Sequence, residues 1–298
     1  MADFRERTIE VRGLPLRVRE RGPERAPAVV LLHGWLDHRG SFDTLAPLLG
    51  EDVRTLALDH RGHGDSGWVG AGGFYHFVEY VADLDGALDA LGLARAGDDP
   101  AGAGAPVRLV GHSLGAAVAL VFAAARPQRV AHAALLDGAP LMTHATEIPR
   151  RLKKYLDDLN LPRARKVVQG IPDAAERMRR AQPNLPAEVA LHLTQGGVSA
   201  DAAQGGALAW KWDPLVRAHS PLPFSEQVLE SLLPEVAAKV LLLRAESGIL
   251  PQEPELRQRL GKLPRLRIEE VRGVGHHLHL QKPEEVAQVI RAAWAAAG

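Results

Sequence analysis

Arg108-Leu-Val-Gly-His-Ser-Leu-Gly-Ala116 is the stretch of sequence that decides the fold. It joins a short apolar run, typical of a buried strand, to the segment from Leu114 to Ala125, in which nearly every residue is apolar. Gly111 and Gly115 flank Ser113 in a G-x-S-x-G pattern, which is typical of a sharp strand-to-helix turn that exposes a serine hydroxyl. Such a turn strains its central residue and admits only glycine two residues to either side. The stretch predicts a strand, a turn with Ser113 as a nucleophile, and a helix buried all round; an ordinary strand-to-helix turn is the alternative.

The first half of the chain alternates short apolar runs with longer helical patterns, which is typical of parallel strands joined by crossover helices. The strands are expected at Thr8 to Val11, Leu16 to Glu20, Ala28 to Leu32, Arg54 to Leu58, Val107 to Val110, Ala133 to Leu136, Val240 to Leu243 and Leu266 to Glu270. The first two predict an edge hairpin. A final helix is expected from Pro283 to Ala296, because a proline and two glutamates in its first turn favour a helix start. The sequence therefore predicts an α/β fold.

From about Leu141 to Leu233 the strand pattern stops, and helical stretches interrupted by prolines take its place. We expect a helical cap inserted after the sixth strand, with residues 1–140 as the first part of the core, 141–233 as the cap and 234–298 as the second part of the core. The Gly-, Ala- and Pro-rich segment from Asp98 to Ala105 predicts a surface loop. Between Arg150 and Arg180 the cap carries ten Lys or Arg and four Asp or Glu, which indicates either a solvated helix face or a site for an anionic substrate.

Composition excludes several classes of protein. The chain has no cysteine, so disulfides, thiolate metal sites and a cysteine nucleophile are excluded. Its 36 Lys and Arg balance its 36 Asp and Glu, so no overall charge favours nucleic acid as a partner. The charged N-terminal residues do not resemble a signal peptide, and no run of 18 apolar residues predicts a membrane span. We expect a cytoplasmic protein that does not bind membranes, and leave open whether it is a monomer or a homodimer.

A serine hydroxyl needs a base to act as a nucleophile at neutral pH, and Gly273-Val-Gly-His-His-Leu-His-Leu280 offers one late in the chain. His276 directly follows a glycine and precedes the final helix, so we expect it to be the base. His277 and His279 are expected to be solvated loop residues. His60 and His63 have a spacing that metal ligands can show, but the sequence offers no further ligand cluster, so no metal is expected.

Two backbone N–H groups are expected to stabilise the oxyanion of a tetrahedral intermediate. Leu114 would supply one N–H group from the start of the helix after Ser113. Trp35 would supply the other, because it follows the strand at Ala28 to Leu32 and stands next to the permissive Gly34. A tryptophan side chain that packs in the cleft wall is compatible with that role of its backbone.

Several of these motifs together resemble the α/β-hydrolase superfamily. They are His33-Gly-Trp35, Asp59-His-Arg-Gly-His-Gly-Asp-Ser66, Gly111-His-Ser-Leu-Gly115 and Gly275-His276. Trp210-Lys-Trp-Asp-Pro214 and Arg244-Ala-Glu-Ser-Gly248 are similar to the serine hydrolase-like branch. The resemblance implies a mostly parallel eight-stranded sheet flanked by helices, a catalytic triad, a lid and no cofactor.

The acid of that triad is where the sequence departs from the family. The family usually has an aspartate in the loop after the strand at Val240 to Leu243, but the positions that correspond to it here are Gly248 or Ser247. Asp137, at the end of the preceding strand, is one candidate, because some members supply the acid from there. Glu246 is the other, with a longer reach from the usual loop. A turn-capping role for Asp137 before a glycine is the structural alternative.

The sequence thus predicts a serine hydrolase that acts on a small carboxylic ester or related acyl substrate through an acyl-enzyme on Ser113. Esterase, thioesterase, lactonase and carbon–carbon hydrolase activities stay open, as does acyl transfer with the same residues. Dehalogenase or epoxide-hydrolase chemistry is disfavoured, because it needs an aspartate in place of Ser113. From a different class of protein, a ligand-binding homologue without turnover is the alternative.

Overall fold

The computed structural model describes residues 4–93, 104–140, 145–160, 163–182, 184–218, 220 and 225–296. The loop expected from Asp98 to Ala105 lies mostly outside these residues. Within them, no helix is both long enough and apolar enough to cross a membrane.

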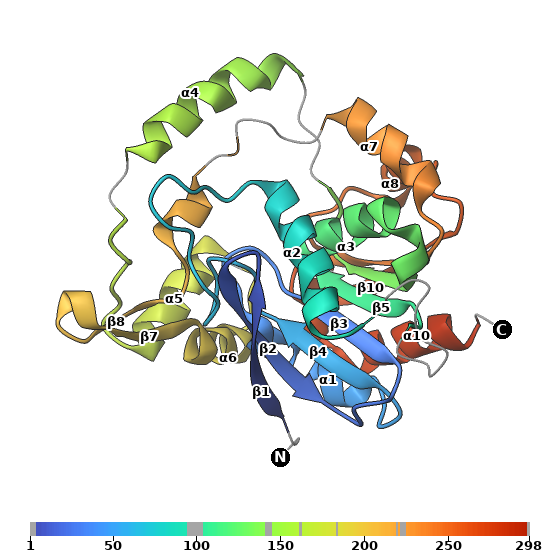
Figure 1. Cartoon of the computed structure of the whole chain (residues 1–298), viewed down its shortest axis with the longest axis horizontal. Coiled ribbons are helices and arrows are strands. Elements are labelled where there is room, and N and C mark those ends of the chain that lie inside the picture. Colours follow the sequence, from blue (N-terminus) through green and yellow to red (C-terminus); the bar gives the residue numbers. More distant parts are fainter. Residues whose placement is uncertain are drawn as a thin grey trace.

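One eight-stranded sheet forms the centre of the molecule, with the strand order β1-β2-β4-β3-β5-β6-β9-β10 (Figure 1). The strands are β1 (Arg5–Val11), β2 (Leu14–Arg21), β3 (Ala28–Leu32), β4 (Arg54–Leu58), β5 (Val107–His112), β6 (Val130–Leu136), β9 (Lys239–Ser247) and β10 (Leu266–Gly275). The edge hairpin of β1 and β2 is antiparallel, and β2 also pairs antiparallel with β4. Every pair from β4 to β10 is parallel. The predicted mostly parallel eight-stranded sheet is therefore confirmed.

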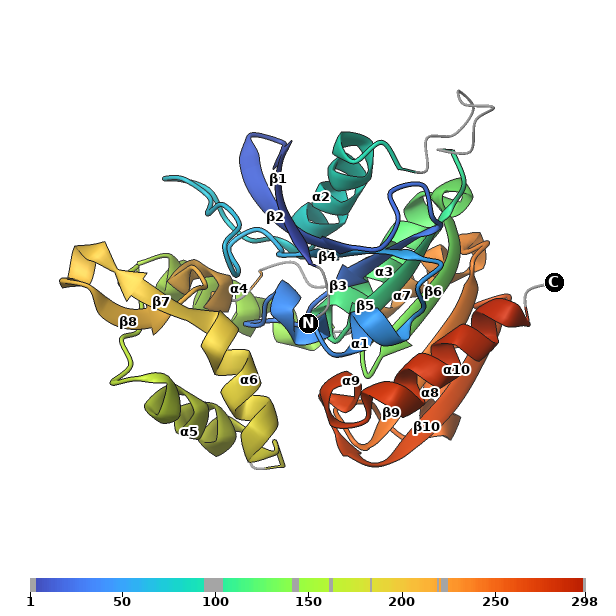
Figure 2. The ribbon, with the colours of Figure 1, turned by 90° about the horizontal axis from the view of Figure 1, so that it is seen from below.

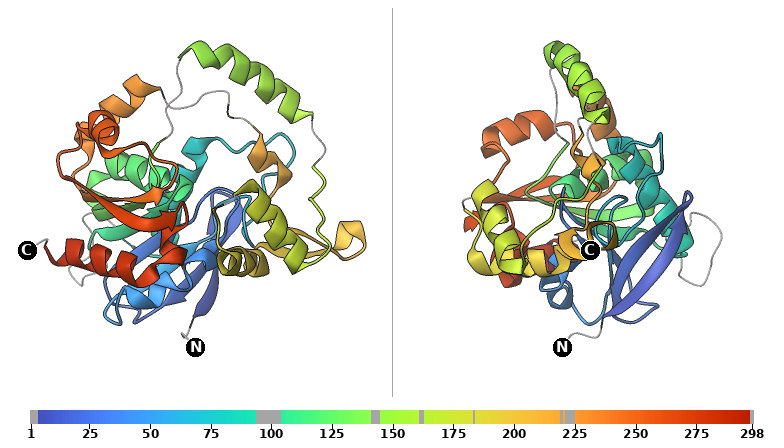
Figure 3. Two further views of the ribbon diagram at one scale, coloured as in Figure 1. Left: turned by 180° about the vertical axis from the view of Figure 1, so that it is seen from behind. Right: turned by 90° about the vertical axis from the view of Figure 1, so that its left-hand side faces the viewer.

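Helices cover both faces of the sheet, because its central strands are apolar on both sides. On one face lie α2 (Phe77–Ala90), α3 (Leu114–Ala125), α7 (Glu226–Leu232) and α8 (Glu253–Leu260). On the other lie α1 (Leu45–Leu48), α9 (Leu278–Gln281) and α10 (Pro283–Ala295). Figure 2 shows the sheet between these layers, and the view from behind in Figure 3 shows α1 beside α10. Helix α3 is buried along nearly its whole length, as its composition predicts.

The cap connects β6 to β9 and contains α4 (Ile148–Leu159), α5 (Ile171–Ala181) and α6 (Ala187–Gly197). Figure 1 shows α4 at the top of the view, above α2 and α3. The cap also contains a two-stranded antiparallel sheet, β7 (Val198–Asp201) and β8 (Ala207–Trp210), which the sequence pattern does not predict. These strands have only four residues each, which is too short for an alternating pattern to stand out. Several hydrogen bonds connect the cap to the core, among them those from Trp35 Nε1 to the Val216 carbonyl at 3.0 Å, from the Tyr75 hydroxyl to Asp213 at 2.8 Å and from His38 Nε2 to the Leu193 carbonyl at 2.9 Å.

Candidate active site

Ser113 occupies the turn between β5 and α3 with φ 52° and ψ −111°, a conformation that non-glycine residues rarely adopt. The flanking glycines explain how the turn fits. A Cβ on Gly115 would lie 2.0 Å from the Leu32 carbonyl oxygen, and a Cβ on Gly111 would lie 2.3 Å from the carbonyl oxygen of Gly115. No side chain fits at either position, so the G-x-S-x-G pattern follows from how closely α3 packs against β3 and β5.

His276 stands directly after β10 and pairs with Asp137, which directly follows β6. The distance from His276 Nδ1 to Asp137 Oδ2 is 2.7 Å. Because an ionised carboxylate only accepts hydrogen bonds, Nδ1 carries the proton, and Nε2 of a neutral imidazole is left as the basic nitrogen. The Asp137 side chain is fully buried, whereas 19% of the His276 side chain is exposed. This arrangement orients an imidazole so that it can accept a proton.

Ser113 and His276 line the same cavity, which has a volume of about 480 Å³. Trp35 and Leu114, the two residues expected to donate their backbone N–H groups to an oxyanion, line it as well. Its apolar lining comes from Phe77, Leu114, Ala117, Ala139, Pro140 and Ile249. The sequence-predicted serine, histidine and N–H donors therefore meet at one cavity between core and cap.

A second cavity of about 510 Å³ adjoins the first, and Trp35, Asp37, Gln182 and His277 line both. The cap lines it with four basic side chains, Lys166, Arg177, Lys211 and Arg217. Lys211 pairs with Asp65 at 2.8 Å and Arg177 with Asp173 at 2.9 Å. Arg217 lies over the ring of Trp212. The part of the cap next to the active site is therefore basic.

The comparisons with known proteins agree with this geometry. A family model described as the Alpha/beta hydrolase family matches residues 29–289. This chain belongs to the α/β-hydrolase family. A serine hydrolase-like protein of Danio rerio is 32% identical over 283 residues, which cover 90% of this chain and 82% of the relative.

Two solved structures are similar to this α/β-hydrolase over nearly its whole length. A hypothetical protein from Pseudomonas aeruginosa PAO1 has a TM-score of 0.83 at 31% identity, and 98% of each chain is covered. The thioesterase domain from the curacin biosynthetic pathway has a TM-score of 0.81 at 25% identity, with 97% of this chain and 99% of that one covered. The predicted membership of the α/β-hydrolase superfamily is therefore confirmed.

Asp137 of this α/β-hydrolase is anchored by the loop that follows β9. Its carboxylate accepts hydrogen bonds from the backbone N–H groups of Ala245 at 3.1 Å and Ile249 at 2.9 Å. A Cβ on Gly248 would lie 2.2 Å from Asp137 Oδ2. The carboxylate of Asp137 thus fills the space that a side chain at position 248 would need. The φ of Asp137, 41°, is another rare backbone conformation at this edge of the sheet.

Glu246 is not the partner of His276. Its Oε2 accepts a hydrogen bond from the backbone N–H of Gly273 at 2.6 Å, and the residue is exposed. This hydrogen bond therefore links β9 to β10 near the surface. Of the two carboxylates that the sequence left open, the structure brings only Asp137 to the imidazole.

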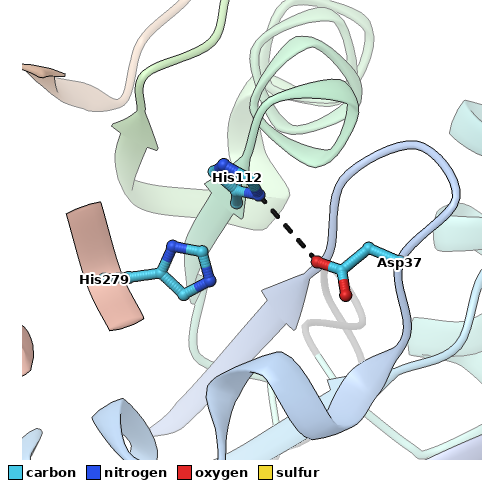
Figure 4. Close-up of side chains that lie close together, drawn as sticks. All are labelled: Asp37, His112 and His279. Atoms are coloured by element: carbon cyan, nitrogen blue, oxygen red, sulfur yellow. Dashed lines mark ion pairs between the residues drawn. The ribbon is translucent and has the colours of Figure 1, made fainter. Parts of the chain in front are cut away.

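Asp37, His112 and His279 lie close together (Figure 4), and His112 directly precedes Ser113 in the chain. His112 Nε2 donates a hydrogen bond to the backbone carbonyl of His276 at 3.0 Å, so the residue before Ser113 is linked to His276. The prediction that His277 and His279 are solvated is wrong, because their relative exposures are 6% and 0%. Burial lowers the pKa of His277 to about 3 and that of His279 well below its ordinary value. Sequence reasoning missed this cluster, because its members are far apart in the chain and lie in a loop, a strand and a helix respectively.

His33, His60 and His63 form a second buried group of imidazoles next to the cavity. Burial lowers the pKa of His60 to about 3 and that of His63 to about 4, so these rings stay neutral near pH 7. Each ring donates to a backbone carbonyl. His33 donates to that of Gly34, His60 to that of His33, and His63 to that of Arg61. These contacts indicate a structural role in holding the loops beneath the active site.

Proposed function

We propose that this α/β-hydrolase is a serine hydrolase that acts on small carboxylic esters or related acyl compounds through an acyl-enzyme on Ser113. The observation that carries the proposal is the contact between His276 and Asp137 of 2.7 Å, at a cavity that Ser113 also lines. A serine, a histidine and a buried carboxylate with these connections are the parts of a catalytic triad.

The proposed reaction follows from the protonation states of the three groups. His276 Nε2 takes the proton of the Ser113 hydroxyl as its oxygen attacks the acyl carbon. The backbone N–H groups of Trp35 and Leu114 stabilise the oxyanion of the tetrahedral intermediate. His276 then gives the proton to the leaving alcohol, and a water activated in the same way releases the acid. Asp137 stays ionised and stabilises the imidazolium.

The cavity supports an acyl group of modest size. Its volume of about 480 Å³ and its apolar lining suit a short or medium acyl chain. Thioesters would follow the same acyl-enzyme route, and the similar curacin domain is a thioesterase. Cleavage of esters and of thioesters needs the same residues. We propose to test esters first, because esters of graded acyl length map the cavity directly.

Hydrolysis of p-nitrophenyl esters of graded acyl length by the wild type and by Ser113→Ala tests the proposal. We expect turnover with short or medium chains, and a loss of about 10⁴-fold or more in kcat for the variant. Ser231→Ala is a matched control, because Ser231 is an exposed serine whose hydroxyl donates only to the backbone carbonyl of Val228 among the described residues. The control should keep wild-type rates.

A fluorophosphonate probe provides a second measurement that does not depend on the choice of ester. We expect it to label Ser113 of the wild type and to leave Ser113→Ala unlabelled. Absence of both ester turnover and labelling would contradict the proposal and would favour a ligand-binding protein without turnover.

A further inference from the structure

Three buried side chains from separate parts of the fold converge beside the active site. Asp37 lies in the loop after β3, His112 ends β5 and His279 lies in α9 (Figure 4). One nitrogen or oxygen atom of each lies within 4.8 Å of those of the other two. The relative exposures of the three residues are 8%, 1% and 0%. These side chains therefore surround a point in the interior that little bulk water reaches.

The atoms that face this point have no hydrogen-bond partner among the residues that the structure describes. They are Asp37 Oδ2, His112 Nδ1 and one ring nitrogen of His279, whose other ring nitrogen points elsewhere and is also without a partner among these residues. Because His112 Nε2 donates to the His276 carbonyl, Nδ1 of the neutral ring presents a lone pair. That lone pair lies 4.0 Å from Asp37 Oδ2, which is too far for a direct hydrogen bond. Two acceptors that face each other in the interior are costly unless a hydrogen-bond donor or a cation lies between them.

In the neighbouring group of His33, His60 and His63, each buried imidazole makes at least one hydrogen bond. His33 uses both ring nitrogens, one toward the Gly34 carbonyl at 2.7 Å and one toward the backbone N–H of His60 at 3.0 Å. His60 and His63 each make a hydrogen bond with one ring nitrogen, to the backbone carbonyls of His33 and Arg61 respectively. His279 uses neither, so no hydrogen bond within the described part of the chain fixes the orientation of its ring.

We propose that Asp37, His112 and His279 form a binding site for a divalent transition-metal ion of the zinc or cobalt class. Two imidazoles and one carboxylate are ligands that such ions prefer, whereas calcium and magnesium prefer oxygen alone. This site goes beyond the proposed hydrolysis, in which the serine reacts without a metal.

The geometry requires only small movements on binding. Tetrahedral zinc with bonds of about 2.0–2.1 Å holds its ligand atoms roughly 3.3 Å apart, so each side chain would move by less than about 1 Å. The His279 ring has no hydrogen bond to break within the described part of the chain. Asp37 keeps its Oδ1 on the backbone N–H of His38 at 2.7 Å and offers its other oxygen. Because Asp37 and His112 also line the cavity of Ser113, the fourth coordination position would open toward that cavity.

Metal binding to the full-length, tag-free protein tests this proposal. After removal of metals with EDTA, Zn²⁺ is titrated by calorimetry, and Co²⁺ binding is followed by visible absorption. We expect one ion per chain, a thermal midpoint that rises with the Zn²⁺ concentration, and a cobalt spectrum of low-symmetry nitrogen and oxygen coordination. Asp37→Asn and His279→Gln should each weaken binding by at least about tenfold.

His63→Gln is the matched control, because it removes an equally buried imidazole from the neighbouring group and should leave metal binding unchanged. Circular dichroism and the thermal midpoint without metal show whether each variant is folded. If His279→Gln does not fold, Asp37→Asn and the wild-type cobalt spectrum still decide the question. Wild type that binds no Zn²⁺, or Asp37→Asn and His279→Gln variants that bind it as wild type does, would overturn the proposal. Neither result depends on ester turnover.

Discussion

Asp137 and Gly248 are complementary, and together they explain why the usual triad loop of the family lacks an aspartate here. A Cβ at position 248 would lie 2.2 Å from Oδ2 of Asp137, so the carboxylate and a side chain at 248 exclude each other. The same loop supplies the two backbone N–H donors that hold the carboxylate. The loop after β9 therefore anchors an acid that comes from the neighbouring strand.

Asp137→Asn should lower kcat for p-nitrophenyl butyrate by about 10⁴-fold, because an amide cannot hold His276 in the required tautomer or stabilise its cation. Glu246→Gln should stay within about twofold of the wild type, since this carboxylate contacts only the backbone N–H of Gly273 among the described residues. Steady-state kinetics of both variants gives the comparison. Small and equal losses would rule out Asp137 as the acid.

How far the sequence predicts the site depends on how local each signal is. Ser113 and His276 stand within short patterns that contain nearby glycines, so the local sequence is enough to identify them as candidates. The sequence cannot decide between Asp137 and Glu246, because the choice depends on which backbone N–H groups face the carboxylate. The prediction for His279 fails, because a histidine in a polar-looking loop is buried here against Phe42, with ring centroids 5.2 Å apart.

Helix α3 packs on the sheet through a contact between backbones. With no side chain at Gly115, the first turn of the helix rests on the carbonyl of Leu32 in β3. This close approach places the start of α3, and with it the N–H of Leu114, at the end of the central strands.

Gly115→Ala should destabilise the protein by about 3 kcal/mol, because its Cβ would lie 2.0 Å from a backbone oxygen that cannot move without the strand. Gly70→Ala is the control, since a Cβ there has nothing within 4 Å. It should change the free energy of unfolding by less than about 0.5 kcal/mol. Urea unfolding measures both, and a Gly115→Ala variant as stable as the control would refute the packing argument.

The elements of the core are predictable from the sequence, and those of the cap are less so. The β3 strand is a continuous apolar run, and β4, β5 and β6 are short segments rich in apolar residues, so their positions follow from the sequence. The β7–β8 hairpin turns at Gly205 and Gly206, both with positive φ, but its strands are too short to show a period. Tertiary contact with the rest of the cap, rather than pattern, decides that they are strands.

The basic side of the cap gives a prediction about substrate charge. Lys166 and Arg217 line the second cavity without a carboxylate in ion-pair distance among the residues the structure describes. Esters that carry a carboxylate, such as 4-acetoxybenzoate, should therefore have a lower KM than their neutral methyl esters.

The double variant Lys166→Gln, Arg217→Gln should reduce this preference by about fivefold, as expected for partly exposed charges, and leave the neutral ester unaffected. Arg180→Gln removes a basic side chain that is 68% exposed and paired with Glu176, and it should change neither KM. A preference that survives in the double variant would place the anion elsewhere.

Neutral buried histidines dominate the response of the whole molecule to acid. Burial lowers the pKa of His33, His112 and His279 well below the ordinary value, and those of His60, His63 and His277 to between about 3 and 4. In the unfolded chain the same side chains take up a proton near pH 6.5. Between these values the unfolded state binds more protons than the folded state, so acid favours unfolding.

The free energy of unfolding should therefore fall steadily from about pH 6.5 to about pH 4.5, by up to about 1.4 kcal/mol per pH unit for each of these histidines. Urea unfolding at several pH values measures the slope. His63→Gln should make the slope shallower by about one proton, because glutamine does not titrate. Stability that stays constant or rises over this interval would contradict the assignment of neutral rings.

The cap is, in its topology, one enlarged connection between β6 and β9, which are paired neighbours in the sheet. Whatever the length of this connection, the strand order and the three side chains Ser113, Asp137 and His276 keep their places. Gene rearrangement can thus join a different cap to the same core, provided that the new module makes contacts with the core such as those at Trp35 and Tyr75. The proposed catalytic residues and the cap lie in separate segments of the chain, so a new cap could change the substrate without changing those residues.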